Sequence, residues 1–308
     1  MILVTGATGF AGSHLLQRLP PESRVIAWAR PEGRPAYSTA TNVEWHAVDL
    51  LDRAAVSKAI ASASPTLVYH LAGAPHVGSS FDNPAQPLEI NALGTHHLLT
   101  AVGNEAPAAR VVVVTSAMIY RPSASPHSEE SDKLPSSPYG LSKLAQDRLA
   151  MLAGADGLNV VVARPFNHTG ARQSPTFAIS GFAQQIARIE AGGAEPVLRV
   201  GNLDAERDIT DVRDVVDAYG VIAARGQAGT PYNVCSGRAW RIGDLLDKLL
   251  QRARVPVRVE VDEGRMRPME LPRLVGDNTR LRALGWEPRV PLETTLDDVL
   301  RDWRARGA

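Results

Sequence analysis

Short apolar segments alternate with longer segments of helical periodicity along the first half of the chain. The run from Ile2 to Thr5 is apolar and rich in β-branched residues, and from Phe10 to Leu19 the leucines recur on one side of an expected helix. Further apolar strands are expected near Val25, Val43, Thr66, Val111 and Asn159. This alternation predicts an α/β fold with a doubly wound parallel sheet.

Three glycines follow the first expected strand, in the spacing G-x-x-G-x-x-G. Gly6 would permit the tight turn out of the strand, Gly9 the close approach of the backbone to a pyrophosphate, and Gly12 the close packing of helix on strand. The alternative is a flexible glycine turn. It is disfavoured because the loop leaves a strand and opens a helix, which is the context that the dinucleotide-binding fingerprint requires. The pattern therefore predicts a dinucleotide site at the helix N-terminus, with Phe10 and Ala11 among its contacts.

The end of the second expected strand, Arg24 to Trp28, favours NADP over NAD. An acidic residue there would bind the 2′-hydroxyl of NAD, but the chain has Ala29 and Arg30. Arg30 can pair with a 2′-phosphate, or it can be a solvated residue before Pro31. Further cofactor contacts are expected after the third and fourth strands, from Asp49, Leu50, Leu71, Ala72 and Gly73.

The alternation loosens past Arg164 to Phe166, where glycine, proline and arginine become more frequent. Residues 211–233 return to the pattern of the sheet, and Leu292 to Trp303 form an amphipathic helix that covers a core. We therefore predict a Rossmann domain that binds NADP and a smaller mixed α/β lobe at the C-terminal side that binds substrate. The first is expected from residues 1–167 with 206–237, and the second from 168–205 with 238–308.

Tyr139 and Lys143 stand four residues apart directly after Pro138, and Tyr139 follows Ser116 by 23 residues. A helix that begins at Pro138 would place phenol and ammonium on one face. The pair can also be ordinary side chains of a helix surface. A phenol titrates near pH ~10, and a nearby Lys143 ammonium and an oxidised nicotinamide would lower that pKa. Tyr139 could then exchange a proton with a sugar oxygen that Ser116 holds.

The composition bounds the possible partners. The chain has 308 residues with 33 basic and 33 acidic side chains, and this zero net charge favours neither nucleic acid nor anionic membranes. No apolar run approaches the ~20 residues of a membrane span, and no signal peptide is recognised. The single cysteine, Cys235, has no Cys/His cluster around it, so we expect a packed thiol, no metal site and a cytoplasmic protein.

Three motifs together resemble the extended short-chain dehydrogenase/reductases that act on nucleotide sugars. They are TGATGFAG at residues 5–12, Ser116 four residues before Tyr120, and the Tyr-x-x-x-Lys that ends at Lys143. The resemblance covers the whole chain. It implies that Ser116, Tyr139 and Lys143 are the catalytic triad.

The same resemblance implies roles beyond the triad. Asn91 would support the triad from a neighbouring helix and belong to the cofactor site. A homodimer would form through helices at about Leu88 to Gly103 and Pro138 to Leu152.

Motifs in the second half resemble the branch of this family that handles GDP-mannose derivatives. They are RPFNHTG at 164–170, VGNLDAERD at 200–208, YNVCSG at 232–237 and the Arg-Pro of 267–268. The resemblance implies that Asn167, Arg207 and Arg267 bind a GDP-sugar, and arginine suits its diphosphate because it offers bidentate donors. Other interpretations stay open: Arg207 can pair with Asp208 or Asp211, Arg267 can be solvated, and His168 can be a structural hydrogen-bonder.

One difference from the sequence pattern of that branch distinguishes 4,6-dehydration from simple reduction of a ketone. A 4,6-dehydratase needs a carboxylate between the serine and the following tyrosine to move the C5 proton, and Met118 occupies that position here. The expected activity is therefore NADPH-dependent reduction of the C4 ketone of GDP-4-keto-6-deoxymannose to a GDP-6-deoxyhexose such as GDP-D-rhamnose. Arg121 replaces a glycine usual in the family, which leaves the shape of its loop open.

Three alternatives remain. A nucleotide-sugar 4-epimerase would use the same triad to oxidise and then reduce its substrate. A GDP-mannose 4,6-dehydratase would need another acid, such as Glu129 or Glu130. A cofactor-sensing protein without catalysis is the third, and the intact triad argues against it.

Overall fold

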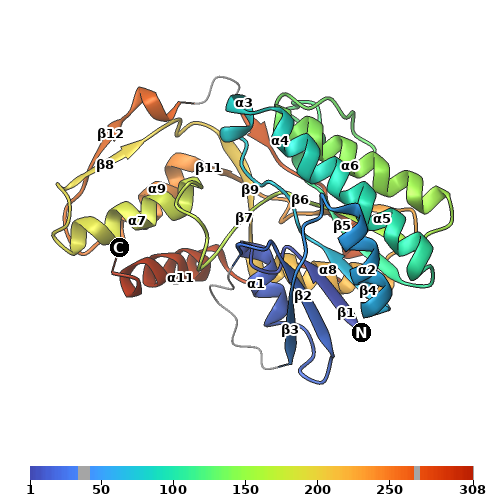
Figure 1. Ribbon diagram of the computed structural model, residues 1–308. Coiled ribbons are helices and arrows are strands. Elements are labelled where there is room, and N and C mark those ends of the chain that lie inside the picture. The colour runs from blue at the N-terminus through green and yellow to red at the C-terminus, as the bar shows by residue number, and fades with distance from the viewer. Residues whose placement is uncertain (34–41, 267–270, 308) are drawn as a thin grey trace.

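The computed structural model describes residues 1–33, 42–266 and 271–307. Its centre is a seven-stranded sheet in the order β10-β6-β5-β4-β1-β2-β3, in which all neighbours are parallel (Figure 1). The strands are β1 (Ile2–Thr5), β2 (Val25–Ala29), β3 (Val43–Ala47), β4 (Leu67–His70), β5 (Arg110–Val114), β6 (Val160–Pro165) and β10 (Pro231–Val234). The order reverses at β1, so the carboxyl ends of β1 and β4 form the crevice where such sheets bind ligands.

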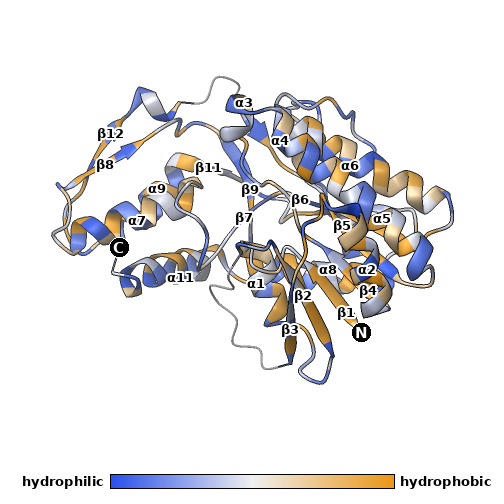
Figure 2. Cartoon of the chain, viewed as in Figure 1, coloured by the Kyte–Doolittle hydropathy of each residue, from blue (hydrophilic) through white to orange (hydrophobic). Residues whose placement is uncertain are grey.

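Side chains along each central strand alternate between two apolar layers. Val4 belongs to the layer under α1 (Phe10–Leu16) and α8 (Val212–Arg225). Leu3 belongs to the layer under α2 (Arg53–Ala63), α5 (Gly94–Glu105) and α6 (Pro138–Ala155). Because both faces are covered there, the inner strands β1 and β2 are largely apolar and are orange in Figure 2, whereas the edge strand β3 carries Glu44 and His46. The predicted fold class is confirmed.

Two expected helices differ in detail from the structure. The first helix, α1, ends at Leu16 and not at Leu19, because Pro20 has no N–H and disfavours helical backbone in the residue before it. The helix expected from Leu88 begins as the π-helix η1 (Leu88–Leu93) and continues as α5. Apolar periodicity gave no sign of this wider turn.

A third apolar core joins α7 (Ala178–Glu190), α9 (Ile242–Leu250) and α11 (Leu292–Ala305). These helices lie on the other side of the molecule from α5 and α6 (Figure 1). Their lobe carries two small sheets. Strands β11 (Ala239–Arg241), β13 (Arg273–Leu274) and β7 (Asn167–Thr169) pair with β9 (Glu206–Asp211), and β8 (Val197–Val200) pairs with β12 (Arg258–Val261).

The short elements of the described chain are α3 (Ser79–Asp82), α4 (Ala85–Pro87), η2 (Ala117–Ile119), η3 (Glu263–Arg265) and α10 (Thr279–Arg282). As expected, residues 211–233 return to the central sheet, as α8 and β10. The exact domain boundaries stay a prediction. None of the helices described is long and apolar enough to cross a membrane.

Candidate active site

The glycine loop after β1 is packed too tightly for side chains. Gly6 has φ +67°, and a Cβ there would lie 2.5 Å from the backbone nitrogen of Ala72. A Cβ at Gly12 would collide with the carbonyl oxygen of Gly6. The Gly9 amide donates to the same oxygen at 3.0 Å, which closes the loop. The loop therefore presents bare backbone at the start of α1, as a dinucleotide diphosphate requires.

The loop after β4 lies between the glycine loop and the predicted catalytic lysine. The Ala72 amide donates to Thr5 Oγ1 at 3.2 Å. A Cβ on Gly73 would lie 2.6 Å from Asn91 Oδ1 and 3.3 Å from Lys143 Nζ. The structure thus brings together two predicted parts, the residues 71–73 and the catalytic helix.

Asn91 lies within η1 and is fully buried. Its Oδ1 accepts from the Ala74 amide at 2.8 Å, and its Nδ2 donates to Ser142 Oγ at 2.9 Å. These bonds hold the loop after β4 against α6. The predicted role of Asn91 in supporting the triad and the cofactor site stays a prediction.

The three predicted catalytic residues converge at the carboxyl end of β5. Ser137 caps α6 by accepting from the Gly140 amide at 3.0 Å, which places Tyr139 in the first turn of the helix. Ser116 caps η2, and its side chain hydrogen-bonds with that of Tyr139. One turn further along α6, Lys143 Nζ donates to the Val114 carbonyl at 3.3 Å. All three side chains are buried.

Burial shifts the pKa values of both Tyr139 and Lys143. Burial raises the pKa of Tyr139, and the hydrogen bond with Ser116 offsets only part of that rise. Burial also lowers the pKa of Lys143 to about 7. Without the cofactor, the pKa of the phenol is therefore raised by burial, on which residue spacing carries no information. The lowering expected from Lys143 together with an oxidised nicotinamide stays a prediction.

The predicted adenosine contacts lie at the ends of β2 and β3. Arg30 is exposed directly after β2. Asp49 is exposed, and its carboxylate accepts from the Leu51 amide at 2.9 Å. Leu50 packs against Gly94 of α5, and its carbonyl accepts from His97 Nδ1 at 2.9 Å. The three residues lie at the carboxyl ends of neighbouring strands, the edge where a dinucleotide is expected to bind.

The predicted substrate contacts lie on β7 and β9. Asn167 is exposed at the start of β7. The next residue, His168, stacks on Phe10 of α1 with ring centroids 5.9 Å apart, and its Nδ1 donates to the Phe166 carbonyl at 2.9 Å. These contacts favour the structural interpretation of His168. Arg207 Nη1 donates to the Glu206 carbonyl at 2.8 Å. The predicted contact Arg267 lies outside the described residues.

Met118 lies in η2, where its amide donates to Ser116 Oγ at 3.1 Å and its side chain packs on the apolar cluster around Tyr120 and Phe166. The loop that follows returns to Asp132, whose carbonyl accepts from the Arg121 amide at 2.8 Å. Arg121 has no left-handed backbone, so its side chain causes no strain there. The glycine usual in the family is therefore not needed for this loop shape.

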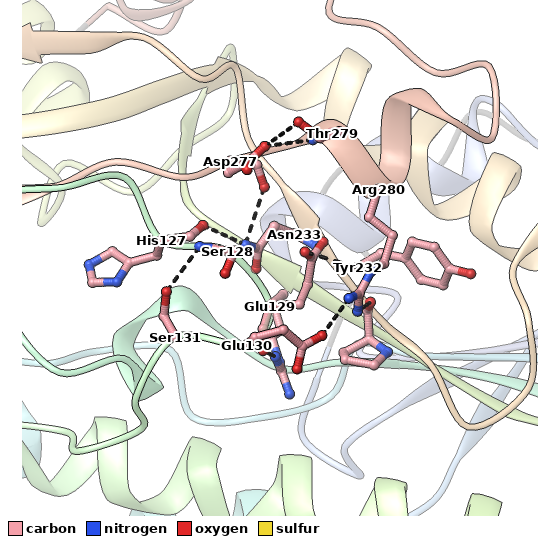
Figure 3. A network of polar contacts seen from close by, with 12 residues as sticks. His127, Ser128, Glu129, Glu130, Ser131, Tyr232, Asn233, Asp277, Thr279 and Arg280 are labelled. Atoms are coloured by element: carbon pink, nitrogen blue, oxygen red, sulfur yellow. Dashed lines mark hydrogen bonds and ion pairs between the residues drawn. The ribbon is translucent and has the colours of Figure 1, made fainter.

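The two glutamates of this loop bind away from the triad. Glu129 Oε1 accepts from the Asn233 amide at 2.8 Å, and Glu130 pairs with Arg280 of α10 (Figure 3). Asn233 Nδ2 also donates to the His127 carbonyl at 2.8 Å (Figure 3). The network ties the loop to β10 and α10, so the described partners of both carboxylates lie outside the triad.

Sequence reasoning missed the residues that hold the catalytic helix in place. Arg164 of β6 forms two hydrogen bonds with Asp147 of α6, each 2.8 Å long, and both side chains are buried. Gln146 of α6 accepts from Lys143 Nζ at 2.7 Å. Gln146 and Asp147 closely follow the Tyr-x-x-x-Lys motif, and that position was the available signal for them. Nothing in the neighbouring sequence identifies Arg164 of β6 as the partner of Asp147.

Cys235 is fully buried, and burial raises the pKa of its thiol well above the ordinary value. This agrees with the predicted packed thiol. Among the described residues, no group of three or more His, Cys, Asp or Glu side chains is arranged to hold a metal ion.

Known proteins resemble this chain along its full length. A model of the GDP-mannose 4,6 dehydratase family matches residues 3–299. The GDP-6-deoxy-D-mannose reductase of Pseudomonas aeruginosa is 35% identical over 99% of this chain and 97% of its own length. A UDP-glucose 4-epimerase of Mycolicibacterium smegmatis is 30% identical over 99% of both.

Solved structures show the same relationship. The structure of RMD from Pseudomonas aeruginosa complexed with NADPH has a TM-score of 0.86 and 35% identity, and the match covers 99% of each chain. A putative epimerase from Burkholderia cenocepacia has a TM-score of 0.88 and 35% identity, over 99% of this chain and 98% of that one. The chain belongs to the GDP-mannose 4,6 dehydratase family, within the extended short-chain dehydrogenase/reductases that its motifs predicted.

Proposed function

We propose that this protein is an NADPH-dependent reductase of the C4 ketone of GDP-4-keto-6-deoxymannose, with a GDP-6-deoxyhexose such as GDP-D-rhamnose as product. The observation that carries the proposal is the buried Ser116, Tyr139 and Lys143 constellation with Met118 in the position where dehydration needs a carboxylate. The names of the relatives support it, because a GDP-6-deoxy-D-mannose reductase and a structure with NADPH are among them.

The bare glycine loop and the adjacent Gly73 fit a dinucleotide, since side chains at Gly6 or Gly12 would fill the cradle. Bound NADPH supplies the hydride for C4. Tyr139 donates the proton to the C4 oxygen, and Ser116 donates a hydrogen bond to that oxygen. The raised pKa of Tyr139 suits this direction, because the phenol stays protonated at neutral pH and ready to donate. Lys143 binds the nicotinamide ribose.

The other contacts in this proposal follow the sequence prediction. Cofactor contacts are assigned to Gly6, Gly9, Phe10, Ala11, Arg30, Asp49, Leu50, Leu71, Ala72 and Gly73, with Asn91 as their support. Substrate contacts are assigned to Ser116, Asn167, Arg207 and Arg267. The two domains proposed above would enclose the sugar nucleotide between them.

We further propose a cytoplasmic homodimer. Leu88 and Leu93 of η1 and Leu141 and Leu152 of α6 are exposed apolar side chains on elements that pack against each other. A patch of this kind on a helix pair is typical of a protein interface. These leucines lie on the two helices through which the family resemblance implies a homodimer.

The cofactor assignment gives the first prediction. We expect wild-type kcat/KM to be higher with NADPH than with NADH, and Arg30→Ala to remove most of that preference because the 2′-phosphate loses its charged partner. Arg24→Ala is the matched control, since Arg24 is an exposed arginine just before the opposite end of β2. Equal wild-type values for the two cofactors would contradict the assignment.

The reaction type gives the second prediction. The wild type is expected to oxidise NADPH with preformed GDP-4-keto-6-deoxymannose, and more slowly with the dTDP and UDP counterparts. Incubated with GDP-mannose and NADP⁺, it should form no 4-keto-6-deoxy sugar by mass spectrometry. Efficient formation of that sugar would replace the reductase by a dehydratase or a bifunctional enzyme.

Met118→Glu restores a carboxylate at the missing position, with Met118→Leu as the control without an acid. We expect at most trace dehydration from the glutamate, because an acid must be held to within about half an ångström by its surroundings. The apolar cluster under Met118 offers no such support.

A further inference from the structure

A chain of buried polar side chains connects β1 to the catalytic lysine. It consists of Thr5, His70, Thr95, Gln146 and Lys143, and we call it the Thr5–Lys143 chain. Thr5 Oγ1 lies 2.7 Å from His70 Nδ1, and His70 Nε2 lies 2.8 Å from Thr95 Oγ1. Gln146 Nε2 donates to Thr95 Oγ1 at 2.9 Å, and Lys143 Nζ donates to Gln146 Oε1 at 2.7 Å.

Burial restricts how the side chains of the Thr5–Lys143 chain can hydrogen-bond with one another. His70, Thr95 and Gln146 are fully excluded from solvent, so a lost hydrogen bond could not be replaced by water. An ammonium offers donors only, so the Gln146 amide oxygen must face Lys143 and its NH₂ group must face Thr95. Burial lowers the pKa of His70 to about 3, so the imidazole is neutral, with one nitrogen donating and the other accepting.

The chain also fixes the loop predicted to hold the cofactor. Thr5 Oγ1, at its far end, accepts from the Ala72 amide at 3.2 Å. Lys143 has a second protein acceptor, the Val114 carbonyl, but that contact is longer, at 3.3 Å. The Gln146 oxygen is therefore the shorter of the two contacts that aim the ammonium.

We propose that Gln146 is a positioning residue of the reaction: its amide, held by Thr95 and His70, fixes Lys143 beside the nicotinamide ribose. This inference rests on the proposed function, because it assigns Lys143 to the cofactor. Gln146 itself touches neither cofactor nor substrate in this assignment. It acts through Lys143.

The groups around Lys143 allow the role of Gln146 to be measured through the titration of Lys143. Its titratable neighbours are Tyr139 on the same helix and neutral His70 on β4. Asp147 of α6 is paired with Arg164 of β6. From η1 and α5, the uncharged Asn91 and Thr95 hydrogen-bond with Ser142 and Gln146, the residues of α6 on either side of Lys143. Burial lowers the pKa of Lys143 to about 7, and a hydrogen bond to the charged form favours that form, so a change of the acceptor at position 146 should shift the pKa of Lys143.

The test is the pH dependence of NADPH affinity, measured by fluorescence titration without any sugar. Wild-type affinity should fall as the pH rises through about 7, because Lys143 loses its proton. Gln146→Met removes the acceptor and should move that midpoint down by about one pH unit. Gln146→Glu supplies a carboxylate and should move it up by about one unit. The 2′-phosphate titrates alike in every variant, so differences between variants isolate Lys143.

Gln173→Met is the matched control. Gln173 is another buried glutamine with two side-chain hydrogen bonds, to Thr169 Oγ1 and to the His168 carbonyl. Its substitution should leave the midpoint unchanged, whatever it does to the melting temperature. If Gln146→Met fails to fold, the upward shift in Gln146→Glu still decides the question.

Midpoints that move in the same direction in both Gln146 variants, or that do not move, would overturn the inference alone. A wild type that binds no NADPH would overturn the proposed function and the inference with it. Opposite shifts in a protein that reduces none of the keto sugars would support the positioning role and refute the proposed substrate.

Discussion

Tyr139→Phe is expected to lower kcat for the keto sugar by at least ~100-fold, the lower end of what a positioned general acid supplies. The substitution removes the proton donor and its hydrogen bond with Ser116. It keeps the ring and the backbone amide that donates to Ser80 Oγ at 3.2 Å, so the start of α6 should not move. NADPH affinity from fluorescence titration should therefore stay close to the wild-type value.

Tyr219→Phe is the matched control for the loss of a buried phenol. Among the described side chains, the Tyr219 hydroxyl is a buried group without a hydrogen-bond partner, and Tyr219 is close enough to Tyr139 to interact with it electrostatically. Its removal should leave kcat unchanged. A Tyr139→Phe enzyme within tenfold of wild type would show that another group supplies the proton.

Arg164→Met is expected to lower the free energy of unfolding by about 3–5 kcal/mol, because it leaves the Asp147 carboxylate buried without its counter-ion. The pair is bidentate, and Arg164 also donates to the Tyr120 hydroxyl at 3.1 Å and to the Glu129 carbonyl at 2.9 Å. Urea unfolding followed by circular dichroism measures the loss.

Arg18→Met provides the comparison with an exposed ion pair. Arg18 and Asp217 are both about half exposed, so breaking that pair should cost about 1 kcal/mol or less. A cost for Arg164→Met no larger than this would mean that Asp147 has access to water in solution. The double variant Arg164→Met/Asp147→Leu should recover much of the loss, because it removes the uncompensated charge.

The parts of the fold that sequence reasoning predicted are those that depend on neighbouring residues. The strand expected at Arg24 to Trp28 was found one residue further on, as β2, and the glycine loop and helix α6 begin where the motifs placed them. The meeting of Ser116 with Tyr139 was expected from the family resemblance. Their roles in catalysis stay predictions.

What could not be predicted depends on residues far apart in the chain. Gln146 matters because it meets Thr95, 51 positions away, and Arg164 because it meets Asp147 on another element. The raised pKa of Tyr139 follows from burial, which spacing within one helix does not reveal. The π-helix at Leu88–Leu93, which contains the buried Asn91, left no sign in the apolar periodicity.

The place of β10 in the central sheet has a consequence for the nascent chain. β10 pairs with β6 at one edge of the sheet, and every residue of β6 is buried in the finished protein. Until residues 231–234 have left the ribosome, β6 keeps an unpaired apolar edge, the kind of edge that recruits other chains into aggregates. A fragment that stops near residue 167 carries the complete triad but keeps that edge open. The half of the chain that holds the predicted catalytic residues therefore depends on a strand synthesised after α7 and β8, which pack in another apolar core.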